Sequence, residues 1–252
     1  MNNWKARFKA SGIHLGISLA VAALAAMLVF WVWYPYPYRE ISGGRELFLL
    51  VVTVDVILGP LITFSIFSKG KSLKALQFDF VVIGLVQLAA LAYGLWTVAQ
   101  ARPVHLGFEF DRFRVVHAIE VDPDKLPLAP PELRSLPWTG PTLLAVRPFR
   151  NPEEQYTTTM AALSGFTLAA NPTLWQPYDQ AQAEVIKAAK PVNELKRRFG
   201  AQAAQIDAVL QSAGRDPATT SYLPMVGRKS FWTVFIDPKT AQVVGFFPLD
   251  SF

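Results

Sequence analysis

The sequence predicts an α-helical membrane protein with three transmembrane helices, followed by an α+β extracytoplasmic domain with an antiparallel sheet. Three observations lead to this fold class. Apolar stretches of about 20 residues recur near the N-terminus, and each is long enough to cross a hydrocarbon core of about 30 Å. Only 17% of the residues are charged, whereas charge runs at roughly 25% in soluble proteins. Beyond residue 100 the composition becomes that of a water-soluble domain.

The three predicted spans cover residues 13–34, 47–67 and 80–98. Basic residues precede the first span, as they would in a signal peptide. Its apolar core is longer than the about 7–15 residues of a signal sequence, and no small-residue cleavage site follows it. We therefore expect a retained anchor and a transmembrane domain over residues 1–100.

Basic residues also predict the orientation, because short loops rich in Lys and Arg stay in the cytoplasm. Such residues flank the inner ends of the spans: Lys5, Arg7, Lys9, Lys69, Lys71 and Lys74. The N-terminus and the 68–79 loop are thus predicted to be cytoplasmic. With three spans, residues 101–252 lie outside, in the periplasm if the membrane is a bacterial inner membrane. Trp and Tyr residues at the outer ends of the first and third spans fit this arrangement.

Residues 101–252 predict one α+β domain. Alternating apolar residues over 104–111 and an apolar run over 115–121 predict a β-hairpin. Six prolines within 122–141 predict an extended loop. The remaining pattern predicts a strand at 142–146, a helix over 152–168, one or two helices within 178–213 interrupted at Lys190-Pro191, and strands at 222–226, 231–236 and 242–247.

Asp55 is the main candidate site residue because it lies inside the second span. A charged carboxylate there costs at least about 2.5–3.5 kcal/mol, so it should be protonated, paired or turned toward protein. A count along the antiparallel spans favours the hydroxyl of Tyr93 as its partner, with Gln87 as the weaker choice. Pro60 frees the carbonyl of Val56 and adds a polar spot. We expect this spot to dock another transmembrane helix, and an internal helix–helix hydrogen bond is the main alternative.

Tyr34 and Tyr36 belong to a Tyr-Pro segment that follows the first span. Proline favours an extended backbone there, and tyrosine favours the headgroup region. A rigid turn with interface anchoring is the preferred interpretation, and contact with a partner is the alternative.

Catalytic patterns are poor. The chain has no cysteine, which excludes disulfides, zinc-thiolate sites, iron–sulfur clusters and thiol catalysis. His14, at the inner membrane edge, and His105 and His117 form no HExxH motif. His105, Glu109 and Asp111 share one strand face, where an exposed polar face is a better interpretation than a metal site. We expect no metal, no cofactor and no enzymatic activity. The dispersed basic residues indicate no nucleic-acid partner.

A set of motifs runs through roughly the first 120 residues: Trp33-Tyr34-Pro35, Gly43-Gly44, Asp55 with Gly59-Pro60 and Thr63, Lys71 and Leu73, Asp79, Gln87-Leu88, Tyr93-Gly94, Ala101-Arg102-Pro103, Phe108-Glu109 and Asp111-Arg112-Phe113. As a set they resemble the type IV pilin accessory proteins of the TfpX/TfpZ type. The resemblance implies an inner-membrane protein of pilus-bearing Gram-negative bacteria, associated with pilus assembly and with extension and retraction. It implies no established catalytic or binding residue. It does supply a partner, since pilin subunits wait in the inner membrane with one apolar helix across it and a globular head outside.

The sequence therefore predicts a non-enzymatic accessory protein that contacts type IV pilin or the assembly machinery through the second and third spans and the outer domain. Two alternatives remain open. One is a membrane enzyme or proton-coupled factor that uses Asp55. The other is a sensor whose outer domain binds a small molecule or a cell-wall fragment, although the cytoplasmic parts are too short for an effector domain.

Overall fold

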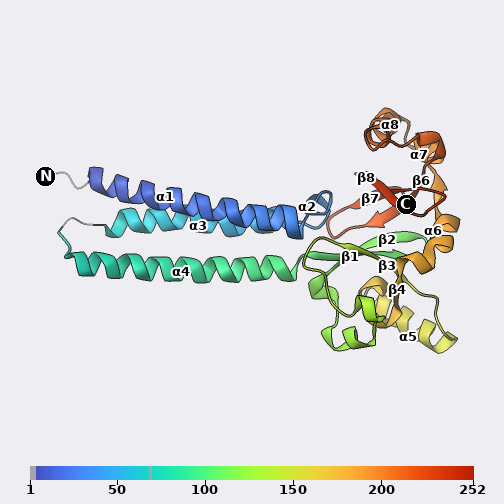
Figure 1. The fold of residues 1–252 in the computed structure, drawn as a ribbon, viewed down its shortest axis with the longest axis horizontal. Coiled ribbons are helices and arrows are strands. Elements are labelled where there is room, and N and C mark those ends of the chain that lie inside the picture. The colour runs from blue at the N-terminus through green and yellow to red at the C-terminus, as the bar shows by residue number, and fades with distance from the viewer. Residues whose placement is uncertain (1–3, 68–69) are drawn as a thin grey trace. The chain divides into compact units, whose positions relative to one another are not determined.

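The computed structural model describes residues 4–67 and 70–252, and the chain divides into two compact units (Figure 1). The helical unit comprises the described residues up to Arg39 and residues 43–101. The sheet unit comprises residues 40–42 and 102–252. Lys69, one of the basic residues that predict the orientation, lies outside the described residues.

Three helices of the helical unit are long and apolar enough to cross a membrane, which confirms the predicted helices. Each is longer than its predicted span at the N-terminal end, because backbone hydrogen bonding continues through polar flanks that hydropathy excludes. Ser72 begins the last helix, and its side chain accepts a hydrogen bond from the N–H of Ala75 at 3.3 Å. The elements of the helical unit are α1 (Trp4–Met27), its π-helical continuation η1 (Leu28–Trp33), α3 (Gly44–Ile66) and α4 (Leu73–Gln100). A short α2 (Tyr38–Ile41) begins in the helical unit and ends in the sheet unit.

Close approach between backbones holds these helices together. α3 packs against both α1 and α4. Gly94 on α4 lies directly against Val51 on α3, where a side chain on the glycine would collide. Gly44, at the start of α3, lies in the same way against the ring of Tyr34. The helical unit thus uses small residues where two helices meet, as membrane helices commonly do.

The sheet unit contains one eight-stranded sheet with the order β4-β3-β1-β2-β6-β7-β8, and β5 pairs with β6 (Figure 1). The prediction of an antiparallel sheet is wrong for two pairs, because β1 runs parallel to β3 and β2 runs parallel to β6. Both pairs join strands that are far apart in the chain, and a pattern of local alternation does not encode such neighbours. The strands are β1 (Pro103–Glu109), β2 (Arg112–His117), β3 (Thr142–Val146), β4 (Trp175–Pro177), β5 (Lys190–Pro191), β6 (Ser221–Val226), β7 (Phe231–Ile236) and β8 (Val243–Phe247).

The predicted hairpin, the strand at 142–146 and the three C-terminal strands are all present. The proline-rich stretch 122–141 holds only short 3₁₀ turns, η3 (Pro123–Leu128) and η4 (Pro131–Leu133). The predicted helix over 152–168 is shorter, and the short strands β4 and β5 were not predicted. The helices of the sheet unit are α5 (Pro152–Leu163), α6 (Gln182–Ala188), α7 (Val192–Arg198) and α8 (Ala203–Ser212).

The expected exposed face of the first strand is wrong, because every residue of β1 is buried. Glu109 forms an ion pair with Arg114 at 3.0 Å and accepts a hydrogen bond from the N–H of Ala169 at 2.7 Å. These bonds satisfy the buried carboxylate and fasten the 168–170 turn to the sheet. β1 is a central strand covered on both faces, so its polar side chains serve the interior.

His105 is the second buried polar residue of β1. Its Nδ1 lies 2.8 Å from the hydroxyl of Thr142, and its ring meets Trp175 edge-on at 4.9 Å between ring centroids. Burial lowers the pKa of His105 from its ordinary 6.5 to about 4. The imidazole is therefore neutral in the folded protein at physiological pH.

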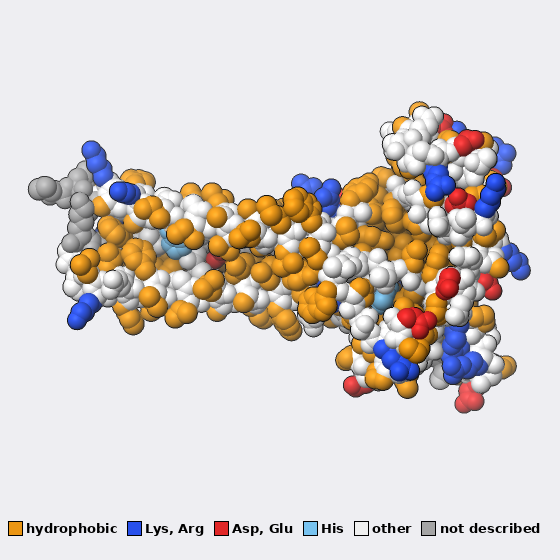
Figure 2. Space-filling view, viewed as in Figure 1, with side chains coloured by type: hydrophobic (Ala, Val, Ile, Leu, Met, Phe, Trp, Pro, Cys, Tyr) orange, Lys and Arg blue, Asp and Glu red, His pale blue; other side chains and the backbone are white. Residues whose placement is uncertain are grey.

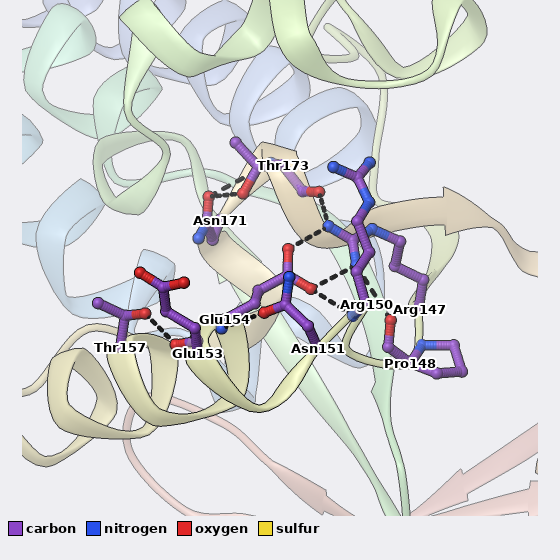
Figure 3. A network of polar contacts seen from close by, with 9 residues as sticks. All are labelled: Arg147, Pro148, Arg150, Asn151, Glu153, Glu154, Thr157, Asn171 and Thr173. Carbon is purple, nitrogen blue, oxygen red and sulfur yellow. Dashed lines mark hydrogen bonds and ion pairs between the residues drawn. The ribbon is translucent and has the colours of Figure 1, made fainter.

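A polar network anchors α5 at its N-terminus (Figure 3). Asn151 caps the helix by accepting the N–H of Glu154 at 2.8 Å. Arg147 forks onto Glu154 at 2.6 and 2.9 Å and also donates to the carbonyls of Pro148 and Thr173. These hydrogen bonds, chiefly those of Arg147, lower the pKa of Glu154 to about 2, so the pair is ionised at neutral pH. No residue of α5 is itself buried, so the network fixes the direction of a helix that stands on the surface.

His105 predicts how the protein responds to acid. In the unfolded chain this histidine binds a proton at a higher pH than in the folded chain, so stability falls as the pH drops from about 6.5 to about 4. A pKa lowered by this much corresponds to about 3 kcal/mol in total. The free energy of unfolding of the full chain in detergent, followed by tryptophan fluorescence, should fall over this pH range. In His105→Gln we expect that fall to be smaller by about 3 kcal/mol. Equal pH dependence of the two proteins would contradict the prediction.

Candidate functional site

A chain of hydrogen bonds connects the three membrane-length helices. The Nδ1 of His14 on α1 lies 2.5 Å from the hydroxyl of Thr63 on α3. The Nε2 of the same ring lies 2.7 Å from the side-chain oxygen of Gln87 on α4. The amide nitrogen of Gln87 donates to both the backbone carbonyl and the Oδ1 of Asp55, each at 3.2 Å. Asp55 and Gln87 lie midway along α3 and α4, so the chain crosses the middle of the helical unit.

The chemistry of the Gln87 amide gives this chain a direction. Only its NH₂ group can donate to two oxygens of Asp55, so its carbonyl oxygen faces His14 and accepts from Nε2–H. The Nδ1 of the same ring pairs with the hydroxyl of Thr63, which can donate or accept. Donation therefore runs from His14 through Gln87 to Asp55. Asp55 is the terminal acceptor, and no residue in the described part of the chain donates to its Oδ2.

The predicted hydrogen bond between Tyr93 and Asp55 is wrong, because Gln87 takes that place. The side chain of Tyr93 is 69% exposed on the surface of α4. The count considered depth but not which face of α4 is turned toward α3. Gln87 shares a face with the buried Ile83, Gly94 and Val98, and Gly94 lies against Val51, whereas Tyr93 lies on an exposed side of α4.

Three residues of the site were missed by the sequence analysis: Ser11, His14 and Thr63. The hydroxyl of Ser11 donates to the carbonyl of Pro60 at 2.9 Å, so α1 contacts the backbone of α3 at the proline itself rather than at Val56. Ser11, His14 and the buried Ser18 recur every three or four residues, and this spacing places them on one face of a helix. That spacing was the available signal.

Gly59 makes the close approach of the three helices possible. A side chain at this position would collide with Gln87 and with the ring of His14. The glycine therefore lets the amide and the imidazole meet over the backbone of α3. The predicted Gly59-Pro60 spot thus lies beside the polar chain, where it supports an internal contact.

Asp55 lies at the edge of two lateral grooves. The larger has a volume of about 600 Å³ and lies between α1 and α4, with Asp55 on its floor. Its walls include Ile13 and Ile17 on α1 and Leu88 on α4. The smaller has a volume of about 230 Å³, lies between α3 and α4 and is lined by Tyr93. Figure 2 shows that the visible surface of the helical unit is mostly hydrophobic, so the half-buried acid is set in an apolar surrounding.

The two tyrosines of the Tyr-Pro segment lie apart from the polar chain. The side chain of Tyr34 is fully buried, and its hydroxyl donates to the carbonyl of Val98 at 3.0 Å. This bond ties the end of the first span to the end of α4. Tyr36 is 59% exposed, and the guanidinium of Arg39 lies 5.6 Å from its ring centroid. Of the two, Tyr36 is the one that offers a surface to a partner.

The sheet unit presents a different candidate surface on α5. Tyr156, Met160 and Leu163 recur at the spacing of one helix face, Phe166 follows them, and all four are exposed. A cavity of about 590 Å³ lies beside this stripe, between residues 119–125 and 158–171. Exposed apolar stripes of this kind are typical of protein contacts. Within the described residues no group of His, Asp and Glu is arranged to hold a metal ion.

The polar chain predicts which substitutions weaken the helical packing. Gln87→Leu removes the donor to Asp55, and hydrogen bonds between membrane helices are worth about 0.6–1.7 kcal/mol. We expect a loss in this range when the full chain is unfolded in mixed detergent and dodecyl sulfate micelles. Tyr93→Phe is the matched control, since it removes only a hydroxyl group, and it should leave stability unchanged. A loss of stability in Tyr93→Phe, together with no loss in Gln87→Leu, would instead support a hydrogen bond between Tyr93 and Asp55.

Comparison with known proteins identifies the family. Residues 2–43 match the family model described as fimbrial assembly protein FimB. The chain is 40% identical over 246 residues to a fimbrial assembly protein of serogroup I from Dichelobacter nodosus, covering 97% of this chain and 95% of the relative. It is 38% identical to the serogroup E1 protein of the same organism over the same shares of both chains. No solved structure matches the chain. Similarity over nearly the full length of both chains shows that the chain belongs to the FimB family of fimbrial assembly proteins, a type IV pilin accessory family, as the sequence motifs predicted.

Proposed function

We propose that this protein is a non-enzymatic accessory factor of the bacterial inner membrane, which supports pilus assembly by holding a transmembrane helix of type IV pilin or of the assembly machinery. Membership of a fimbrial assembly family supports a role in pilus biogenesis. The observation that carries the docking step is the half-buried acid at the middle of α3, open to a lateral apolar groove. Inside a membrane an acid of this kind marks a functional site, because it is costly unless something requires it.

The proposed topology has a transmembrane domain over residues 1–100 and a periplasmic domain over residues 101–252. The basic residues near the N-terminus and in the loop between α3 and α4 support a cytoplasmic location for that end. Exposed aromatic side chains lie near the ends of the first and third spans that are predicted to face outward: Trp31, Tyr36 and Trp96. Such aromatic side chains suit the interface between hydrocarbon and water.

The sheet unit would then contact the part of the same partner that lies outside the membrane. The apolar stripe of α5 suits this role, because the ionised pair of Arg147 and Glu154 fixes the helix while its apolar residues stay exposed. A surface held from one end in this way loses little conformational freedom on binding.

Crosslinking in cells tests the docking step. A photoreactive amino acid at Ile17 or Leu88 faces the larger groove, whereas one at Val86 lies on α4 outside both grooves and is 64% exposed. In a piliated bacterium that expresses the full chain, we expect adducts with pilin or another pilus component at the two groove positions but not at Val86. Absence of such adducts, or equal yields at all three positions, would overturn the proposed docking.

Asp55→Asn separates docking from a proton-coupled or enzymatic use of the acid. The amide keeps the shape of the side chain and one acceptor but cannot carry the charge. Docking predicts that adducts at Leu88 and the number of pili fall together. A catalytic or proton-coupled role predicts that piliation is lost while the adducts persist at their original yield. Counting pili by electron microscopy beside the crosslinking yield distinguishes the two.

A further inference from the structure

The polar chain ends on an acceptor that nothing in the described protein fills. Gln87 uses both of its amide hydrogens on Asp55, one on the carbonyl and one on Oδ1. His14 and Thr63 are occupied with each other and with Gln87. The Oδ2 of Asp55 is therefore the open end of a chain whose donors all point toward it. As a carboxylate, this end lacks a hydrogen-bond donor.

Asp55 cannot reach water to satisfy this oxygen. It lies at the centre of α3, roughly 16 Å along the axis from either end at about 1.5 Å per residue. Its side chain is short, so it cannot extend to the interface as a lysine near a helix end does. The donor must come from inside the groove.

The larger groove has the dimensions of a helix site. Its walls run along α1 from Ala10 to Val21 and along α4 from Phe80 to Leu91, which is about three helical turns on each side. α1 and α4 pack mainly on α3, and the hydrogen bond between His14 and Gln87 joins them directly at one level of the groove. Gly84 lies on one wall with no atom near enough to touch a side chain placed there. A second backbone can therefore approach α4 closely at this point.

We infer that this groove selects a transmembrane helix that carries a hydrogen-bond donor at mid-membrane depth, and most strongly a lysine ammonium. This inference rests on the proposed docking function and names the chemistry of its partner. A lipid chain fills the apolar walls but brings no donor to this depth. A second copy of this chain is equally unsuited, because its mid-depth Gln87 and His14 are engaged in their own polar chain and its Asp55 would face another acid.

Synthetic host helices test this selection. We would use a leucine–alanine helix of one span with a single central guest residue, Lys, Leu or Glu, and the full chain in lipid nanodiscs. Because the chain contains no cysteine, Lys74→Cys provides one labelling site for energy transfer to a labelled helix. We expect the Lys guest to bind about tenfold more tightly than the Leu guest, which corresponds to about 1.4 kcal/mol.

Two variants keep the test sharp. Asp55→Leu removes the acceptor and should abolish the preference, so that the Lys and Leu guests bind this variant with equal affinity. Gly84→Leu fills the groove without touching the polar chain and should weaken binding of every guest. Gly59→Leu is unsuitable for this purpose, because a side chain there strikes Gln87 and His14.

The outcomes are distinct. Equal affinity for the Lys and Leu guests, tightest binding of the Glu guest, or a Lys preference that survives Asp55→Leu would each overturn the inference. If pilus components crosslink at Ile17 and Leu88 in cells but the guests bind equally, the docking function stands and its donor chemistry falls. If the guests are discriminated but no pilus component crosslinks, the groove chemistry stands and the proposed function falls.

Discussion

A polar group inside hydrocarbon must find its partner within the protein, and the helical unit is built around this constraint. The hydrogen-bond partner of Asp55 is Gln87, and the partner of Gln87 on its other side is His14. One residue from each long helix is thereby joined in a single chain across the middle of the unit. The same chain ends on an unfilled oxygen, so the internal contact and the proposed external contact share one carboxylate. In the proposed function, this one acid serves both the packing of the helices and the recognition of a partner.

Glycine makes the polar chain geometrically possible. Gly59 lies under the contact between Gln87 and His14, and Gly94 brings α4 onto α3 one turn away. At the end of the unit Gly44 accommodates the buried ring of Tyr34. Without these close approaches the side chains of α1 and α4 would meet over a thicker α3, too far apart for short hydrogen bonds. Membrane helices gain little from the hydrophobic effect when they associate, so close packing and hydrogen bonds have to supply the attraction.

The sheet unit also has polar side chains that are buried and need hydrogen-bond partners. Its central strand buries two polar side chains: Glu109 is matched by Arg114 and a backbone amide, and the Nδ1 of His105 is matched by Thr142, while its Nε2 has no hydrogen-bond partner among the described residues. At the surface the reverse holds, since α5 leaves its apolar stripe uncovered. An uncovered apolar helix face is typical of a domain that contacts another protein. Each unit therefore has one feature that its own packing does not explain: the free oxygen of Asp55 in the helical unit and the exposed apolar stripe of α5 in the sheet unit.

The sequence by itself determined what depends on neighbouring residues. Hydropathy located the three long helices, alternation located the first strand of the hairpin, a short apolar run indicated the strand at 142–146, and an acid in an apolar run marked the centre of the site. It could not determine which residue faces Asp55, because that depends on which face of α4 packs against α3, and this face carries Gln87 and leaves Tyr93 exposed. It could not determine that the sheet is mixed, because β3 and β6 find their neighbours across long connections. Only the tertiary structure settled these pairings, since a contact between distant segments depends on the placement of every element between them.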